Sequence, residues 1–152
     1  MVFDSVLICI WSSLRCFAML DGVKDFTVSS TLQKNFKEFG KAHLFDKLPE
    51  TCWHSDCGSP QWILLVLDNI RRLTSLKIQF QGGFSSPEVK IEGWSDDEQS
   101  KCECLVFPED NNSVQTFDIP LLKGCSSYRF VFNKSSDLFG RIVVYELEPF
   151  FE

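Results

Sequence analysis

The sequence is poor in the groups from which catalytic sites are usually built. Only two histidines, His43 and His54, occur among its 152 residues, and no oxyanion-hole motif such as Gly-x-Ser-x-Gly accompanies them. The glycine pair at 82–83 lacks the spacing and the lysine of a phosphate-binding loop. A nucleophile pair of Cys52 or Cys57 with a histidine stays open, but no third, orienting group is recognisable. We therefore expect a protein that is not an enzyme and holds no cofactor.

Positive charge is also scarce. Fifteen Lys and Arg residues are outnumbered by 21 Asp and Glu residues, so the formal net charge is −6. Proteins that bind nucleic acids by neutralising phosphates are usually basic. The segment 34–47, with four lysines against two acidic residues, is only mildly so. We expect no direct contact with nucleic acid.

Long hydrophobic runs are missing as well. The apolar run at residues 6–11 is far shorter than the roughly 20 residues that a bilayer requires. A signal peptide would begin with positive charge, whereas no Lys or Arg precedes Arg15. We therefore expect neither secretion nor membrane attachment. Because Met19 offers an alternative start, residues 1–22 are expected to be an N-terminal extension or alternative-start segment, followed by one domain over 23–152.

The seven cysteines are an odd number and cannot all pair in disulfides. This favours reduced thiols in an intracellular protein, where cysteine acts as a small hydrophobic residue. A zinc site is the alternative, because Cys52, His54 and Cys57 are close in sequence, and Cys102 and Cys104 would share a strand face. The spacing departs from the usual Cys-x(2–4)-Cys pairs of structural zinc sites. We expect no bound metal.

Alternation of apolar and polar residues dominates the chain from about residue 26. It predicts strands over 76–80, 89–92 and 128–132, separated by Gly, Ser, Asn and Asp turn signals. The strand after residue 141 is expected to place Val143, Tyr145 and Leu147 on one side. Strong helical periodicity is absent, apart from a short helical turn within 32–39. The pattern predicts an all-β protein, an antiparallel β-sandwich or jelly roll.

Two tryptophans are predicted to lie in the core. The continuous apolar run 62–67 predicts a strand that is covered on both faces. Trp53 and Trp62 flank the loop that enters this strand, and large aromatic residues in that position are usually buried. We therefore expect both rings to be structural.

The segments 44–46, 50–56 and 61–63 resemble the discoidin, or coagulation-factor C-type, family. Its early loop reads Leu-x-Asp-Gly-Asp-x-x-Thr-x-Trp, and the resemblance implies a galactose-binding-like jelly roll. Many members bind calcium with this loop. Here Lys47 and Leu48 replace the family's Gly and second Asp, which removes an oxygen ligand. We therefore expect Asp46 and Thr51 to fasten the loop backbone instead of holding calcium.

Further segments, at 79–86, 107–113 and 139–141, resemble an intracellular branch of that family whose members associate with a nuclear receptor. The resemblance covers residues 26–149. It implies a monomeric nuclear protein, also present in the cytoplasm, that binds an orphan nuclear receptor and represses transcription. The alternative is a secreted or surface glycan-binding lectin. A lectin would need exposed aromatic residues beside Arg, Asn and Asp in a cleft at the loop end.

Two aromatic residues fall outside the inward-facing pattern and are the predicted partner-binding residues. Phe84 follows the glycine pair, and Trp94 shares its strand face with Lys90 and Glu92. Aromatic rings on a polar surface are candidate anchors, because desolvated rings dominate the energetics of protein interfaces.

Overall fold

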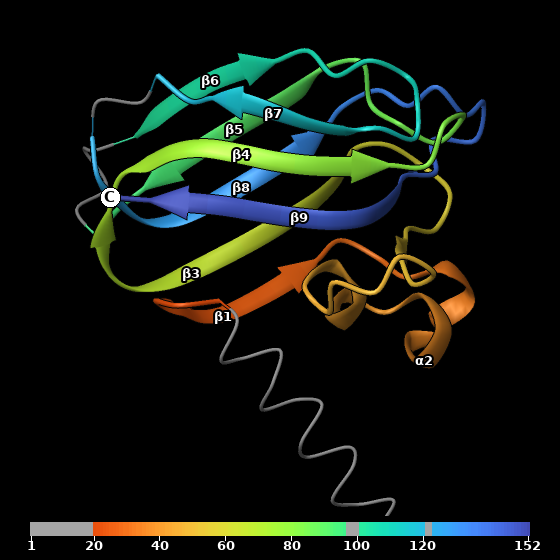
Figure 1. Cartoon of the computed structure of the whole chain (residues 1–152), viewed down its shortest axis with the longest axis horizontal. Helices are drawn as coiled ribbons and strands as arrows, with labels where there is room; N and C mark the ends of the chain where they lie inside the picture. The colour runs from red at the N-terminus through yellow and green to blue at the C-terminus, as the bar shows by residue number, and fades with distance from the viewer. Residues whose placement is uncertain (1–19, 97–100, 121–122) are drawn as a thin grey trace, which may run out of the picture.

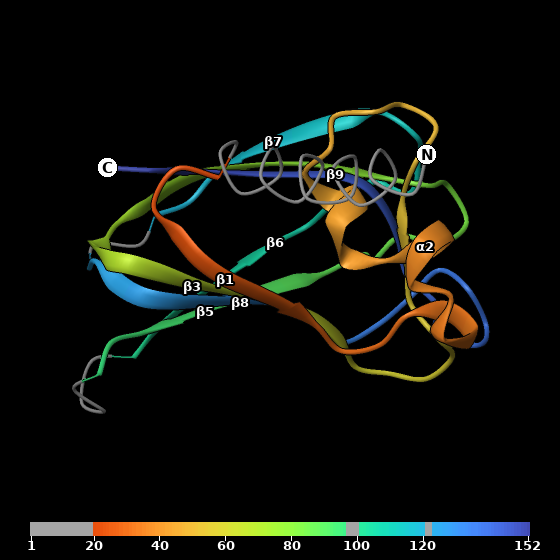
Figure 2. The ribbon, with the colours of Figure 1, turned by 90° about the horizontal axis from the view of Figure 1, so that it is seen from below.

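The computed structural model describes residues 20–96, 101–120 and 123–152, and these form a two-layered antiparallel β-sandwich (Figures 1 and 2). The fold class predicted from the sequence is confirmed. One sheet has the order β1 (Val23–Val28), β3 (Gln61–Arg71), β8 (Cys125–Phe132), β5 (Val89–Trp94) and β6 (Cys102–Val106). The other has the order β2 (Trp53–His54), β9 (Val143–Phe151), β4 (Leu73–Phe80) and β7 (Val114–Asp118).

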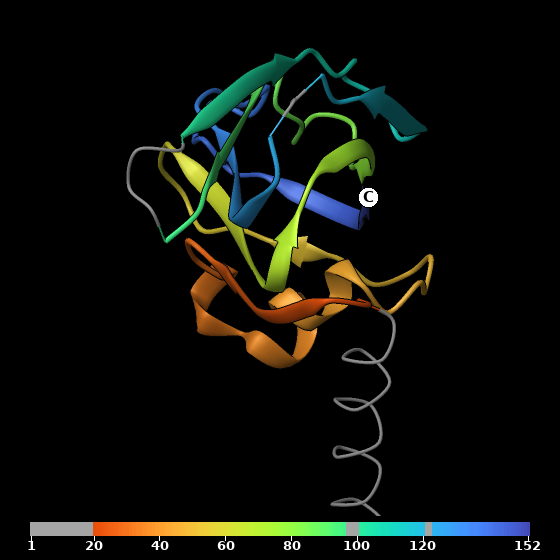
Figure 3. The same ribbon diagram turned by 90° about the vertical axis from the view of Figure 1, so that its left-hand side faces the viewer.

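Three short helical segments connect β1 to β2. They are η1 (Leu32–Lys34), α2 (Phe36–Phe39) and η2 (Lys41–Leu44), so the predicted helical turn within 32–39 is confirmed. Figure 3 shows these segments beside β1, on the side of the sandwich away from β6 and β7. Within the described residues, no helix is long and apolar enough to span a membrane.

The core lies between the two sheets and follows the predicted alternation. Leu76, Ile78 and Phe80 of β4 face the aromatic residues of β8, and all are nearly inaccessible to solvent. Tyr128 also fastens the β3–β4 connection, because its hydroxyl donates to the Arg71 carbonyl at 2.6 Å and accepts from the Leu73 N–H at 3.1 Å. Both sheets are therefore joined by packing and by a buried hydrogen-bonded phenol.

Two details differ from the sequence-based expectation. The pairing of β9 with β4 changes register between Val144 and Glu146, where a β-bulge inserts one extra residue into β9. The bulge changes the parity, so Val144 and Leu147 face the core while Tyr145 is half-buried. Trp62 is half-buried too, because β3 is covered only on its inner face and its side chain points outward. Trp53, by contrast, is fully buried as predicted.

The predicted division at residue 22 lies largely outside the described residues, which begin at Leu20. The turn at residues 20–22 leads into β1, and Leu20 packs against the core cluster. The domain predicted over 23–152 contains every strand of the described chain.

Candidate functional site

The β2–β3, β4–β5, β6–β7 and β8–β9 loops, which join the two sheets, lie at the end of the sandwich next to α2, on the right of Figure 1. Backbone hydrogen bonds fasten them to one another. The Gly58 N–H donates to the Phe139 carbonyl at 2.7 Å, and the Ser136 N–H donates to the Ser85 carbonyl at 2.8 Å. Because segments far apart in sequence are tied directly together, this loop end is a built surface and not a set of independent loops.

A row of four rings and one guanidinium crosses this end. We call it the aromatic row, and it consists of Phe39, His54, Phe84, Arg141 and Phe139. The ring centroids of Phe39 and His54 are 5.3 Å apart, and those of His54 and Phe84 are 5.9 Å apart. The guanidinium of Arg141 lies 5.2 Å from the Phe84 ring and 5.5 Å from the Phe139 ring. These separations are within the range of aromatic and cation–π contacts.

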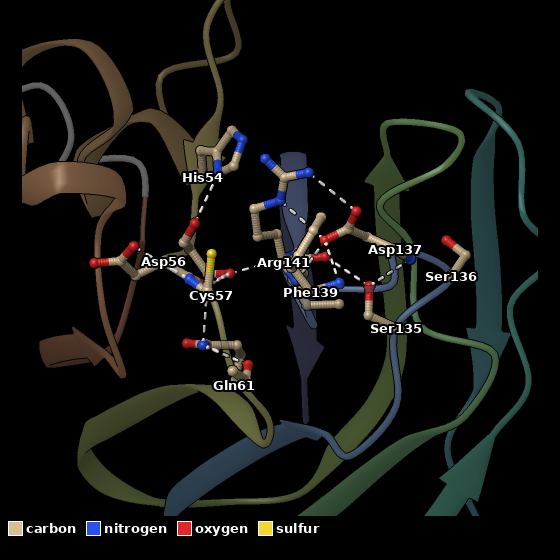
Figure 4. Close-up of polar contacts among 12 residues, drawn as sticks. His54, Asp56, Cys57, Gln61, Ser135, Ser136, Asp137, Phe139 and Arg141 are labelled. Carbon is tan, nitrogen blue, oxygen red and sulfur yellow. Dashed lines mark hydrogen bonds and ion pairs between the residues drawn. The ribbon is translucent and has the colours of Figure 1, made fainter.

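Asp137 holds the β8–β9 loop in shape. The backbone N–H groups of Phe139 and Arg141 donate to its Oδ2 at 3.2 and 3.1 Å. The Arg141 guanidinium donates from Nε to Oδ2 at 2.9 Å and from Nη2 to Oδ1 at 3.0 Å (Figure 4). Arg141 is therefore paired with a carboxylate four residues earlier in the chain.

This loop presents apolar side chains to water at its tip. Leu138 is 97% exposed and Phe139 is 65% exposed. The loop turns back at Gly140, whose φ of +78° suits glycine, and a Cβ there would lie 2.7 Å from Ser59 Oγ. We call Leu138 and Phe139 the loop tip. A fixed turn that keeps two large apolar residues in solvent is a feature of protein contact sites.

Buried polar groups support the loop end from below. Gln61 donates from Nε2 to the carbonyls of Gly58 and Asp56 at 2.8 and 3.1 Å (Figure 4). Ser55 Oγ accepts from the Ile142 N–H at 2.8 Å, which joins the β2–β3 loop to β9. No buried side-chain nitrogen or oxygen among the described residues lacks a partner. The site is therefore held in position before any ligand arrives.

The two predicted contact residues lie at opposite ends of β5. Phe84 is a half-buried member of the aromatic row, on the loop before this strand. Trp94 ends the strand on the outer face of the five-stranded sheet, where the Arg129 guanidinium lies 5.8 Å from its ring. Glu92 accepts from Arg129 Nη2 at 2.6 Å. The structure therefore does not bring Phe84 and Trp94 together on one surface.

A shallow hollow adjoins Trp94 and has a volume of about 740 Å³. Its walls carry opposite charges, and Lys90 bridges Glu92 and Glu103 at 3.1 Å each. Because these charges pair with one another, the hollow offers a mixed-charge surface around one aromatic ring. Sequence analysis found Trp94 but missed the loop tip, whose only signal was a Ser-Ser-Asp turn before Phe139 and Gly140.

The loop at residues 46–51 is closed by protein donors, as predicted. Asp46 accepts from the Leu48 N–H at 2.9 Å and from Thr51 Oγ1 at 2.6 Å, and its Oδ2 lies 3.0 Å from His43 Nδ1. In the described part of the chain, no three His, Cys, Asp or Glu side chains gather to hold a metal ion. The carboxylate oxygens of Asp46 already have partners, so the loop has a structural role.

Within the described residues, neither histidine forms a hydrogen bond with a thiol. His54 Nδ1 lies 2.7 Å from the Ser55 carbonyl oxygen, and the two His43 ring nitrogens face Asp46 and the Lys37 carbonyl. Burial raises the pKa of the Cys52 thiol, with smaller effects from Glu38 and Asp46, which disfavours the nucleophilic thiolate. The described residues therefore show no hydrogen-bonded Cys–His nucleophile pair.

The hydrogen bonds that Asp137 accepts from Arg141 and Phe139 predict a contribution to stability that depends on pH. Hydrogen bonds from Arg141 hold the pKa of Asp137 at about 2, below its ordinary value of 3.8. The ionised carboxylate thus stabilises the fold fully above about pH 4, and this contribution is lost as the pH falls through about 2. Asp137→Asn should lower stability by about 1 kcal/mol at neutral pH, a value reduced by solvent screening. Thermal melts at neutral and acidic pH should show the difference from wild type shrinking in acid; an equal difference at both pH values would contradict this assignment.

Comparisons with known proteins give close relatives in sequence and many in fold. No protein-family model matches the chain. The nuclear receptor 2C2-associated protein of Danio rerio is 46% identical over 80% of this chain and 86% of its own length. The proteins of the same name from Homo sapiens and Xenopus tropicalis are 45% and 39% identical, over 79% and 86% of this chain and 86% and 96% of their own lengths.

Solved structures share the architecture at low sequence identity. An F5/8 type C domain from Bacteroides fragilis has a TM-score of 0.68 at 16% identity, covering 86% of this chain and 95% of that domain. A chitosan-binding module from Paenibacillus sp. IK-5 has a TM-score of 0.66 at 18% identity, covering 87% and 96%. The family 32 carbohydrate-binding module of Clostridium perfringens NanJ, solved with galactose, has a TM-score of 0.63 at 19% identity, covering 84% and 93%. These likenesses show a galactose-binding-like β-sandwich.

Proposed function

Because this chain belongs to the family of nuclear receptor 2C2-associated proteins, we propose that it is a non-enzymatic interaction module that binds an orphan nuclear receptor and represses transcription. The names of its relatives support an association with a nuclear receptor. Repression would follow if the bound module weakens the receptor's engagement with its DNA response elements. The proposed site of action is the nucleus, and also the cytoplasm, with the protein acting as a monomer.

The observation that carries a protein-binding function is the loop tip. The side chains of Leu138 and Phe139 are exposed to solvent, while Asp137 fixes the backbone of the loop by accepting hydrogen bonds from the N–H groups of Phe139 and Arg141. A rigid apolar projection loses little conformational entropy on binding, and buried aromatic anchors contribute strongly to affinity. The loop end is therefore the proposed receptor-binding surface.

Charge supports the proposed mechanism of repression. The chain has a net charge of −6, whereas a DNA-binding surface must be basic. An acidic module is attracted to such a surface and can cover it without touching DNA. We therefore propose no direct contact with nucleic acid and none with a membrane.

Purified receptor and its labelled response element provide the test. The immobilised protein should capture the receptor, and increasing amounts of it should reduce the fraction of response element bound by the receptor. The protein alone should leave the mobility of the DNA unchanged at low salt. Failure to capture the receptor, or a mobility shift by the protein alone, would contradict the proposal.

The residues predicted from the sequence, Phe84 and Trp94, remain proposed contacts and can now be tested separately. Phe84→Ser should weaken receptor capture several-fold, because it removes one ring of the aromatic row and the partner of Arg141. Trp94→Ser tests the opposite end of β5, and the double variant should combine both losses because distant sites act independently. Circular dichroism checks the fold. Unchanged capture by a folded double variant would place the contact elsewhere.

A glycan-binding function is the second candidate. The exposed Phe139 ring lies beside Arg141, which pairs with Asp137, and an exposed aromatic ring beside Arg and Asp is part of the combination expected of a lectin. Titration with galactose, followed by the backbone amide resonances of residues 137–141, separates the candidates. Saturable shifts at these amides would favour a lectin, whereas no shifts together with receptor capture would favour the interaction module.

A further inference from the structure

Two cysteine thiols meet inside the sandwich at the end opposite the loop tip. Cys102 begins β6 and Cys125 begins β8, and these strands lie on either side of β5. Their sulfur atoms are 3.2 Å apart. Cys125 is fully buried and Cys102 is half-buried against the core cluster. Among the described cysteines, no other pair is joined by a hydrogen bond.

Gly93 is the reason that the thiols can meet. It pairs with Cys102 on one side and with Tyr128 on the other, in the middle of the sheet. A Cβ built on Gly93 would lie 2.8 Å from each sulfur and 3.0 Å from the Tyr128 ring. Glycine weakens a strand and often marks a place of close approach. Here the space above Gly93 is filled by the two sulfur atoms.

We propose that Cys102 and Cys125 form a redox-sensitive pair, which a hydroperoxide oxidises to an intramolecular disulfide linking β6 to β8 across β5. Cys102 is the more accessible thiol and reacts first. Its thiol loses a proton, the thiolate sulfur attacks a peroxide oxygen, and the O–O bond breaks to give a sulfenic acid and hydroxide, which takes up the released proton to form water. The Cys125 sulfur then attacks the sulfenic sulfur and expels a second water. Two thiols and one hydrogen peroxide give one disulfide and two waters. The sulfur separation must contract from 3.2 Å to about 2.05 Å.

The surroundings make this oxidation slow at neutral pH. Burial, followed by the hydrogen bond with Cys125, raises the pKa of Cys102 to about 12. The thiolate is the reactive species, so the rate of oxidation should rise about tenfold for each unit of pH below that value. Brief exposure to oxidant would leave the pair reduced, whereas sustained exposure would close it.

The link would fix the part of β5 that carries Trp94. Trp94 follows Gly93 directly, and Ser126, next to Cys125, donates to the Trp94 carbonyl at 3.3 Å. A disulfide between the flanking strands would therefore restrain the ring on the outer face. An effect of this restraint on receptor capture rests on the proposed function of Trp94, whereas formation of the disulfide does not.

Peptide mapping of the peroxide-treated wild-type chain tests the proposal without any variant. The expected product is a peptide pair joining residues 102 and 125, with a loss of about 2 Da that a thiol reductant reverses. It should form faster at about pH 9 than at about pH 7. Cys57, which is exposed, reports that the oxidant was active. Oxidation at Cys57 without a link between 102 and 125 would overturn the proposal.

Two variants sharpen the assignment. Cys102→Ser should abolish the linked peptide, whereas Cys104→Ser, on the same face of β6, should retain it. The Cys104 variant is the matched control, because it removes a half-buried thiol from the same strand. If Cys104→Ser removed the linked product and Cys102→Ser did not, the pair would be wrongly assigned. Receptor capture is a separate measurement, so failure of the proposed function leaves this result unaffected.

Discussion

Replacing Trp53 with alanine is expected to lower the free energy of unfolding by about 3–5 kcal/mol, the usual cost of deleting a large buried aromatic side chain. Trp53 is fully inaccessible to solvent, and its indole N–H donates to the Ser30 carbonyl at 2.9 Å. Its ring also lies 6.3 Å from that of Phe132, across the two sheets. The substitution leaves a cavity where β2 meets the core and removes the donor of a partly buried hydrogen bond.

Urea denaturation measures this effect, and Trp62→Ala is the matched control. Trp62 is the same type of residue, but it lies half-buried on the outer face of β3. Removing an outward ring leaves no enclosed cavity, so the control should lose clearly less stability than Trp53→Ala. Equal losses in the two variants would contradict the assignment of Trp53 to the core.

The second large effect is expected at the loop tip. Changing Leu138 and Phe139 together to serine should weaken receptor capture at least tenfold, because the variant loses two exposed apolar anchors. Stability should change little, since both side chains are exposed and the Asp137 hydrogen bonds use only the backbone of Phe139. Binding isotherms with purified receptor, together with thermal melts, measure the two quantities separately.

A control with exposed apolar side chains is available elsewhere on the chain. Ile70 is 65% exposed and Phe150 is 41% exposed, and they lie near the ends of β3 and β9, at the end of the sandwich opposite the loop tip. Changing both to serine should leave receptor capture intact. If this control weakened capture as much as the loop-tip variant, general surface hydrophobicity would explain the result and the loop tip would lose its special role.

The strands could be predicted where one residue in two faces the core without interruption. Over residues 76–80 of β4 and throughout β5, burial follows the alternation of the sequence, because successive side chains of a strand point to opposite faces. In β9 the prediction for Tyr145 was wrong, since a bulge adds one residue and reverses the parity. A bulge depends on the partner strand, which a local pattern does not contain.

The site was harder to predict than the fold. Phe84 was identified because it follows a glycine turn, but its neighbours in the aromatic row come from α2, β2 and the β8–β9 loop. Their proximity is created by tertiary pairing, so spacing in the sequence carries no signal of it. Arg141 shows the same limit: its partner, Asp137, is local, but the turn that aims them at each other forms around Gly140.

The order of strands also determines when the chain can fold during its synthesis. β9, the last strand, lies between β2 and β4, and β8 lies between β3 and β5. One interior strand of each sheet is thus made late. The edges of β3 and β5 that face β8, and those of β2 and β4 that face β9, stay unpaired until then. Because pairing between distant segments is slow and exposed edges favour aggregation, nascent chains of this protein should need chaperone protection until β9 has emerged.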